Sequence, residues 1–261
     1  DYSAAPLLVV FGAWVLVQGW RTEGVGDGMR AALRFSGGAA MPIAVLLGYQ
    51  WVAFGNPLLP AQVYMPDTGL SVAGWHGFTL PSVELLRGNL FDLRYGLIAF
   101  CPMLAAAFAA PFIARGNRRF SGAELWLIFA ATGALYLFSS SVQFALLQWN
   151  TGVRYMVPAV PLLFLALVPV LLRLPGWARW TLILPTVAVS WSVSMVREDV
   201  PTSLMHVFFR GLELPWLTVL EKTAGAYLPF LAQGSSPIAI FLFAGVVLWL
   251  MWKGQGAGNR E

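Results

Sequence analysis

Charged residues are scarce in this chain of 261 residues: Asp, Glu, Lys and Arg together make up 11% of it. A water-soluble domain carries roughly 25% charged residues, so a surface of this composition cannot face water over most of its area. The apolar share is 58% and the mean hydropathy is +0.70, which also excludes a disordered chain. The scarcity of charge therefore predicts a protein that crosses a membrane several times.

Cysteine and histidine are nearly absent as well. Cys101 is the only cysteine, which excludes an intrachain disulfide and a cysteine-based metal cluster. The two histidines, His76 and His206, cannot form a multi-histidine metal site. Phosphate-binding glycine loops, nucleotide-binding fingerprints, HExxH and GxSxG are also missing. The net charge of +4 is spread in short basic clusters between apolar runs, which argues against nucleic acid as a partner.

Long apolar runs are what the sequence has in place of these motifs. Seven of them are long enough, or nearly so, to cross a hydrocarbon core of roughly 30 Å, and they lack strand-like alternation. They lie at residues 4–20, 35–54, 95–114, 125–147, 155–172, 180–196 and 237–252. We therefore predict an all-α fold, a polytopic transmembrane helix bundle of about seven spans that forms a single domain over residues 1–261. Because the chain starts at Asp1 without an initiator Met, we expect the C-terminal part of a longer protein.

The basic residues divide unevenly between the two sets of loops that seven spans create. One set holds ten of the sixteen Lys and Arg residues and four of the twelve acidic ones. Its basic residues are Arg21, Arg30, Arg34, Arg115, Arg118, Arg119, Arg173, Arg179, Lys253 and Arg260. Since loops rich in Lys and Arg stay in the cytoplasm, we predict that Asp1 lies outside and Glu261 lies in the cytoplasm.

The two longest connections, near residues 55–94 and 197–236, lie on the predicted outer side. Both are rich in proline, glycine and aromatic residues and too apolar for flexible linkers, so we expect ordered loops. In the second, Leu204, Phe208 and Leu212 follow helical spacing, which predicts an amphipathic helix over residues 204–220 in the membrane–water interface. By this interpretation, any function belongs to the outer side.

Arg154 is the strongest candidate for a binding residue. It lies at the predicted outer end of the fifth apolar run, after Trp149 and Asn150 and directly before Tyr155. A guanidinium can bind a lipid phosphate through two parallel hydrogen bonds that Lys cannot reproduce, and Trp149 and Tyr155 could flank the same head group. The alternative is an arginine that only extends to bulk phospholipid head groups beside an aromatic belt.

A second group of candidates lies in the first outer loop. It contains Asp67, His76, Asp92 and Arg94, and His76 could donate a hydrogen bond to a sugar. Asp67 or Asp92 could act as a base or hold a divalent cation. The alternatives are that Asp92 and Arg94 neutralise each other, that Asp67 is a turn residue, and that His76 is merely solvated. None of these side chains can be assigned as catalytic from the residues alone.

Three segments of the sequence share their order and spacing with a known family. The first contains Tyr49, Trp51, Phe54, Gly55 and Pro57, the second contains Gly96, Leu97 and Pro102, and the third contains Trp149, Gly152, Arg154, Tyr155, Pro158 and Pro161. Over roughly residues 1–172 the chain resembles the C-terminal half of bacterial C-type membrane glycosyltransferases, the protein-mannosyltransferase-like group that uses lipid-linked sugars. Residues beyond 172 match only in forming further apolar runs.

This resemblance implies a multi-pass protein of the bacterial inner membrane that transfers a hexosyl or pentosyl group. The donor would be a polyprenyl-phosphate sugar, held by Arg154, Tyr155, Trp149 and Asn150. The acceptor would lie on the extracytoplasmic side, and the acceptor or sugar side of the site would be lined by Tyr64, Asp67, His76 and Arg94. The family's catalytic acid lies in the first extracytoplasmic loop, and we expect this chain to begin downstream of it. The alternative is a non-catalytic accessory or scaffold subunit of a larger membrane complex, with membrane lipids and other membrane subunits as partners.

Overall fold

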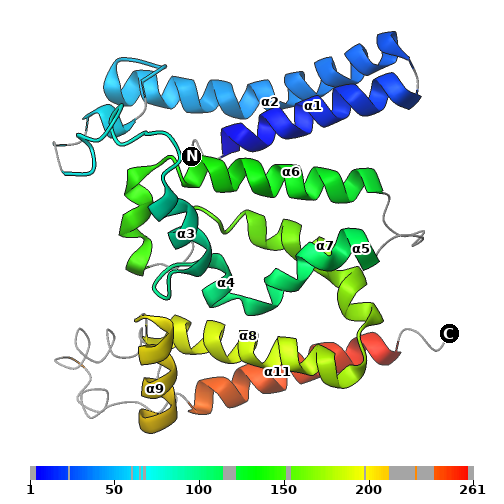
Figure 1. The fold of residues 1–261 in the computed structure, drawn as a ribbon, viewed down its shortest axis with the longest axis vertical. Helices are drawn as coiled ribbons and strands as arrows, with labels where there is room; N and C mark the ends of the chain where they lie inside the picture. The colour runs from blue at the N-terminus through cyan, green and yellow to red at the C-terminus, as the bar shows by residue number, and fades with distance from the viewer. Residues whose placement is uncertain are drawn as a thin grey trace. The chain divides into compact units, whose positions relative to one another are not determined.

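In the computed structural model the described residues form helices and turns, and none of them forms a β-strand beyond isolated bridges (Figure 1). The structure describes residues 4–22, 24–59, 61–64, 66, 69–113, 122–150, 154–196, 198–211, 227 and 238–257. The chain divides into two compact units, Asp1–Val187 and Ala188–Glu261. The all-helical architecture is confirmed for the described residues, whereas a single domain over the whole chain stays a prediction.

Most of the helices belong to the first unit. The longer ones are α1 (Ala5–Thr22), α2 (Val25–Phe54), α3 (Val83–Phe91), α6 (Gly122–Ser139) and α7 (Ala159–Arg173). Short segments connect them, with η marking a 3₁₀ helix: η2 (Ala61–Tyr64), α4 (Leu97–Phe100), η3 (Pro102–Ala109), α5 (Ala110–Ile113) and η4 (Gln143–Asn150). α8 (Gly176–Val196) begins in the first unit and ends in the second, which also contains α9 (Val200–Arg210) and α11 (Ile238–Ala257). Every predicted apolar run overlaps at least one helix.

Within the described part of the chain, three helices are long and apolar enough to cross a membrane: α1, α2 and α6. No residue in the apolar stretch of α1 or α2 is fully buried inside the protein, so much apolar surface stays accessible on these two helices. An apolar surface of this extent is stable in lipid and would be a liability in water. The structure therefore supports association with a membrane. The number of seven spans stays a prediction, because α7 is shorter, and α8 and α11 are not among the helices that meet both the length and the hydropathy criterion in the described residues.

α1 and α2 pack as a hairpin whose close approach depends on glycine. A Cβ atom added at Gly19 would lie 2.5 Å from the Gly28 Cα atom, and one added at Gly28 would collide with the Trp20 ring. Gly24, between the two helices, has a φ of 93°, a conformation that side chains disfavour. Glycine at these positions lets the two helix backbones come together without displacing a side chain.

α2 is longer than the sequence predicted, because it begins at Val25 rather than at residue 35 and continues through Pro42. Asp27 lies in its first turn and accepts a hydrogen bond from Arg30 at 3.0 Å. A carboxylate near a helix N-terminus is favourable, and an (i, i+3) pair of opposite charges adds to this. The polar residues before the apolar run therefore extend the helix instead of ending it.

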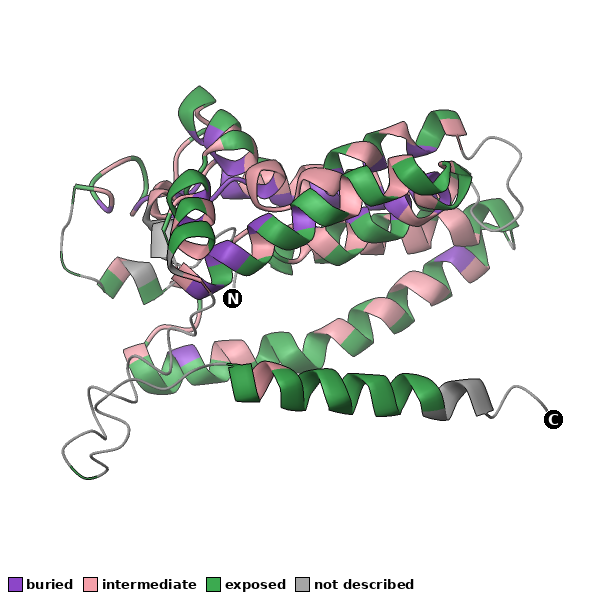
Figure 2. Ribbon diagram, turned by 90° about the horizontal axis from the view of Figure 1, so that it is seen from below, coloured by how far each residue is buried: buried purple, intermediate pink, exposed green. Residues whose placement is uncertain are grey.

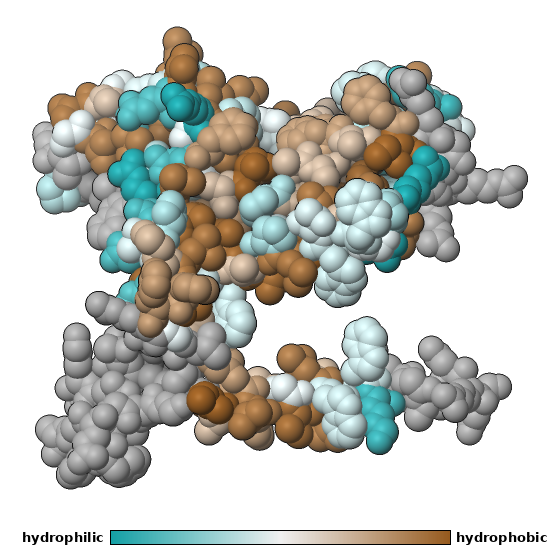
Figure 3. All heavy atoms as spheres, turned by 60° about the horizontal axis from the view of Figure 1, so that its bottom comes forward, coloured by the Kyte–Doolittle hydropathy of each residue, from teal (hydrophilic) through white to brown (hydrophobic). Residues whose placement is uncertain are grey.

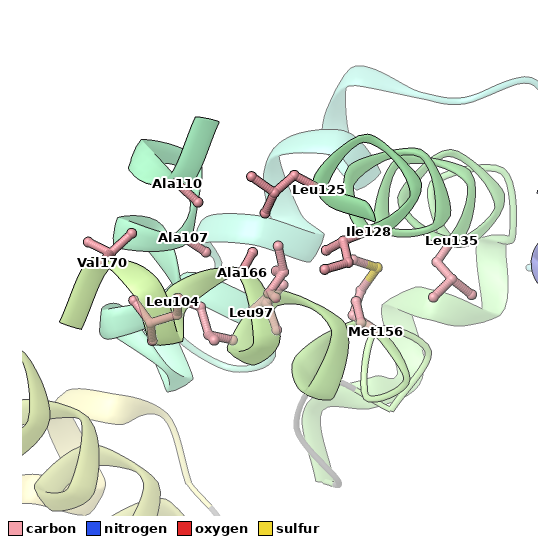
Figure 4. Close-up of a cluster of buried hydrophobic side chains, with 13 residues drawn as sticks. Leu97, Leu104, Ala107, Ala110, Leu125, Ile128, Leu135, Met156, Ala166 and Val170 are labelled. Carbon is pink, nitrogen blue, oxygen red and sulfur yellow. The ribbon is translucent and has the colours of Figure 1, made fainter. Parts of the chain in front are cut away.

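The buried core of the first unit lies where α4, η3, α5, α6 and α7 meet (Figure 4). Leu104 of η3, Leu135 of α6 and Leu163 of α7 are fully buried in it. Met156, three residues before α7 begins, is also fully buried in this cluster. The core therefore fixes the start of α7 as well as the helix itself.

The third predicted span, residues 95–114, is not one helix: the structure divides it into α4, η3 and α5. Cys101 has a φ of −136° and a ψ of 70°, because the ring of Pro102 disfavours the helical conformation in the residue before it. The Met103 N–H beyond the break donates to Thr186 Oγ1 of α8 at 3.0 Å. Thr186 Oγ1 donates in turn to the Leu182 carbonyl at 3.0 Å. A side chain 83 residues away thus satisfies an amide next to the break.

In the second unit, α11 is apolar over most of its length and polar toward its C-terminal end (Figure 3). Its described side chains are almost all exposed (Figure 2). Lys253 Nζ lies 4.9 Å from the centroid of the Trp249 ring, an arrangement typical of a membrane–water boundary. The predicted span over residues 237–252 matches this helix closely.

α9 overlaps the first part of the predicted interfacial helix, residues 204–220. Asp199 caps it by accepting a hydrogen bond from the Thr202 N–H at 2.8 Å, which satisfies one of the free amides of the first turn. Phe208 and Phe209 are exposed on it. Residues 212–220 lie outside the described residues, and the interfacial location of the helix stays a prediction.

The helices α6 and α7 of the first unit run in opposite directions, so their connection lies at one end of the unit (Figure 1). α3 lies at the same end, and the Ser82 N–H before it donates to the carbonyl of Ser140 after α6 at 3.1 Å. We call this end, formed by residues 69–96, 139–150 and 154–158, the α3 end. In the predicted topology it faces outside.

We expect Thr186→Val to destabilise the protein, because it leaves the Met103 N–H without its acceptor at a site partly removed from water. An unsatisfied donor of this kind costs about 1–3 kcal/mol. The matched control is Thr181→Val on the same helix, where the hydroxyl only donates to the Trp177 carbonyl at an exposed position. Thermal unfolding of the purified protein in detergent measures both. Equal losses for the two variants would show that the amide after the break needs no partner.

Candidate functional site

Hydrogen bonds hold the outer loop against the end of α6 and against η4. The Thr79 N–H donates to the Ser141 carbonyl at 2.8 Å, and the Gln143 N–H donates to the Gly77 carbonyl at 2.8 Å. The Gln143 side-chain amide also donates to Thr79 Oγ1 at 3.1 Å. From residue 69 onward, the predicted outer loop is therefore folded onto the bundle.

Buried polar groups join α3 to α6. Asn89 Nδ2 donates to Ser140 Oγ at 3.3 Å, and both side chains are almost completely buried. The Tyr136 hydroxyl donates to the Leu86 carbonyl at 2.6 Å. Ser139 Oγ is buried beside Ser140 and has no hydrogen-bond partner among the described atoms. These contacts orient α3 on α6 and give the α3 end a polar interior.

Arg154 lies at the α3 end in the turn that precedes α7, and its side chain is exposed. Tyr155 is half-buried, and Met156 is fully buried in the core cluster. Two residues after the exposed arginine, the chain is thus anchored in the core. The guanidinium is presented to the surroundings on a backbone that the core holds in place.

Trp149 and Asn150 end η4, and they lie five and four residues before Arg154, respectively. Their backbone belongs to the α3 end, and their side chains lie outside what the structure describes. A chain segment spans at most about 3.6 Å per residue, so Asn150 and Arg154 lie within roughly 14 Å of each other. The backbone of all four predicted phosphate-binding residues therefore belongs to the α3 end. Contact between their side chains stays a prediction.

Tyr64 belongs to a different aromatic group. Its ring stacks on Phe54 with the ring centroids 4.9 Å apart, and Tyr49 meets Phe54 edge to face at 6.4 Å. Tyr64 is partly exposed, in η2 after the end of α2. Asp67, the neighbouring candidate for the acceptor side, lies outside the described residues. The structure therefore places Tyr64 against Phe54 at the end of α2.

Arg94 forms an ion pair with Asp92. Its Nη2 lies 3.0 Å from Asp92 Oδ2, while its Nε and backbone N–H both donate to Asp92 Oδ1, at 3.1 and 2.8 Å. The guanidinium also lies 5.8 Å from the centroid of the Tyr95 ring. Partial burial alone would raise the pKa of Asp92, but the hydrogen bonds and the positive charge of Arg94 lower that pKa below its usual value. Of the alternatives left open by the sequence, the structure shows the one in which Asp92 and Arg94 neutralise each other.

This ion pair should give the protein a small pH-dependent stability. Because the pKa of Asp92 is lowered in the folded state, the contribution is present at neutral pH and is lost as the pH falls below about 4. Arg94 is largely exposed, so we expect Asp92→Asn to lower the free energy of unfolding at pH 7 by less than about 1 kcal/mol. Chemical unfolding at pH 7 and pH 3 measures this, and in an Arg94→Gln background the substitution should have no such effect. A loss of equal size at both pH values would contradict the assignment to charge.

Carboxylates do not gather into a metal site in the described part of the chain, where no three His, Cys, Asp or Glu side chains come together. Asp92 is paired with Arg94, and Asp199 caps α9. A divalent cation therefore has no support from these residues, and its other predicted ligand, Asp67, lies outside them.

Comparison with known proteins gives no relative. No protein-family model matches the chain, and neither a curated protein nor a solved structure matches it. The function therefore has to be argued from the α3 end itself and from the sequence pattern.

Two features of the α3 end were not recognised in the sequence. The first is the buried contact between Asn89 and Ser140, whose only sequence signal is the run of three serines at residues 139–141 inside the fourth apolar segment. The second is Trp75, which lies between Gly74 and His76 in the outer loop. Two glycines flanking a Trp-His pair indicate a tight turn that presents both rings, and this signal could have been read from the sequence.

Proposed function

We propose that this chain is the C-terminal portion of a membrane glycosyltransferase-like protein that binds a polyprenyl-phosphate-linked sugar at the α3 end. It would cross the bacterial inner membrane about seven times, with Asp1 outside and Glu261 in the cytoplasm. Sugar would pass from the lipid phosphate to an acceptor on the extracytoplasmic side, with inversion at the anomeric carbon. The order of three sequence segments and the placement of Arg154 support this proposal.

The observation that carries the proposal is the placement of Arg154. Its guanidinium is exposed, while Met156, two residues later, is fully buried. An arginine on a backbone held in this way loses less conformational freedom when it binds, so its planar donors are better suited to a phosphate than a mobile side chain would be. Arg94, by contrast, is already engaged by Asp92. Arg154 is therefore the better candidate for the donor phosphate.

In this role Arg154 would bind the phosphate that becomes the leaving group and would stabilise the negative charge that develops on it. Tyr155, Trp149 and Asn150 would surround the same group. The proposal assigns no catalytic acid or base to this chain, since the family's acid lies upstream of the region that it resembles.

A second candidate function is a non-catalytic accessory or scaffold subunit. The pairing of Asp92 with Arg94 favours it, because a carboxylate held in an ion pair is a poor general base. In that case the α3 end would bind lipid or another membrane subunit without reaction. The two candidates differ in whether sugar is transferred, and they share the phosphate site where the scaffold subunit binds lipid.

Arg154→Lys tests the phosphate site, because it keeps the charge and removes the paired hydrogen bonds. A charge-assisted contact of this kind is worth about 1.5–3 kcal/mol, so we expect binding of a polyprenyl-phosphate analogue to weaken by roughly tenfold to hundredfold. The measurement is calorimetric titration of the purified protein. Arg173→Lys is the matched control, an exposed arginine in the last turn of α7, which Arg154 precedes. Equal affinity in all three proteins would mean that Arg154 only anchors the chain to bulk lipid.

A further inference from the structure

Residues 74–77, Gly-Trp-His-Gly, form a tight turn at the α3 end. Trp75 and Phe78 exchange two backbone hydrogen bonds, each 2.9 Å long, and the Gly77 N–H donates to the Ala73 carbonyl at 3.0 Å. Gly74, His76 and Gly77 all have positive φ values, of 60°, 49° and 85°. The turn is thus built from the left-handed conformations that glycine adopts readily and other residues avoid.

A histidine is unusual at such a position, because its side chain disfavours a positive φ. Among the residues that the structure describes, His76 is the only non-glycine residue with a positive φ. Glycine is required at positions 74 and 77 of the turn, since a Cβ at Gly74 would collide with the Phe78 carbonyl oxygen and a Cβ at Gly77 would lie 2.5 Å from the Phe144 ring. At position 76 glycine would also relieve strain, yet a histidine is present. Strain retained in this way points to a use for the imidazole ring itself.

The surroundings of the turn keep it rigid. The Phe78 ring contacts the rings of both Trp75 and Phe138, with centroid distances of 6.0 and 6.1 Å. The Gly77 carbonyl accepts the hydrogen bond from the Gln143 N–H that ties the turn to η4. Trp75 nevertheless remains 53% exposed, and its ring meets the half-buried His76 edge to face at 5.7 Å. A flat aromatic surface and an imidazole are therefore held side by side at the surface.

Anchoring in the membrane interface does not account for this arrangement. Trp126 and Trp177 are 76% and 75% exposed on ordinary helices, and they can serve as interfacial anchors without any strained neighbour. The segment 69–80 contains no Asp, Glu, Lys or Arg, so it carries no fixed charge to attract an ion. What the turn presents to a ligand is the apolar face of the Trp75 ring beside the hydrogen-bonding imidazole of His76.

We propose that Trp75 and His76 bind the hexose ring of a lipid-linked sugar or of its acceptor. A pyranose has one face of C–H groups, which suits the indole surface, and a rim of hydroxyl groups, which suits the imidazole. The rigid turn sets the distance between these two contacts before the sugar arrives. This inference rests on the proposed function, since it assigns the sugar to Trp75 and His76 and leaves the phosphate to Arg154.

The test uses three probes on the full chain in detergent: farnesyl phosphate, farnesyl phosphoryl hexoses, and the free methyl hexosides, with mannose, glucose and galactose as the hexoses. We expect Trp75→Ala to weaken binding of at least one hexose probe by about tenfold, as loss of an aromatic stacking contact does, and to leave farnesyl phosphate unchanged. Loss on the lipid-linked hexose identifies the donor as the source, and loss on the free hexoside identifies the acceptor. Equal loss for farnesyl phosphate and its hexose derivatives, or no loss with any hexose, would overturn the proposal.

Substitutions at His76 distinguish a role of the imidazole in binding from a role in forming the turn. His76→Gly should raise the Tm, because it relieves the left-handed strain, and should weaken hexose binding several-fold, because it removes the imidazole. His76→Asn should recover part of the binding, since asparagine tolerates this conformation and keeps a hydrogen-bonding group. A higher Tm with unchanged hexose binding in His76→Gly would contradict the proposal even if Trp75→Ala fails to fold.

Arg154→Lys distinguishes this proposal from the proposed function. If Arg154→Lys leaves farnesyl phosphate binding intact while Trp75→Ala weakens hexose binding, the phosphate site fails and the sugar site stands. If Arg154→Lys weakens all phosphate probes while Trp75→Ala and His76→Gly bind hexoses normally, the sugar site fails and the phosphate site stands.

Discussion

The fold depends on one constraint, that a backbone amide away from water must have a hydrogen-bond partner. Helices satisfy this by themselves, which explains why a chain with 11% charged residues is mainly helical in its described part. Pro102 interrupts the helical hydrogen bonding, and the Met103 N–H donates instead to Thr186 Oγ1 of α8. The break can persist because a helix distant in sequence supplies the missing oxygen, and the short segments η3 and α5 then pack their apolar side chains into the core.

The same core determines what the α3 end can present. Met156 is buried in it, so the exposed Arg154 stands on a fixed backbone. On the other side, Asn89 and Tyr136 hold α3 to α6, and the Gln143 N–H holds the turn that carries Trp75 and His76. A guanidinium and an aromatic pair therefore belong to one end of the first unit, each supported by buried contacts. Chemistry suited to a phosphate and chemistry suited to a sugar occur together there.

Much of the helical pattern could be predicted from hydropathy, because a helix in lipid must be apolar over most of its length. The runs 180–196 and 237–252 correspond closely to α8 and α11. The division of residues 95–114 could not be predicted with the same certainty, because Pro42 and Pro169 lie inside α2 and α7 without ending them. Whether a proline breaks a helix depends on a tertiary partner such as Thr186. For the site, the exposure of Arg154 was foreseeable from its position, whereas the strain at His76 appears only once the turn is closed by Phe78.

The central claim is that the α3 end, with Arg154, faces the outside of the cell. Single cysteines introduced by Val72→Cys and Trp177→Cys, in a Cys101→Ala background, test it directly, because both positions are well exposed and belong to opposite predicted sides. Intact cells would be treated with a membrane-impermeant maleimide. The account predicts labelling of the Val72→Cys protein alone, with Trp177→Cys labelled only after the cells are opened. Labelling of Trp177→Cys in intact cells, with Val72→Cys protected, would contradict it.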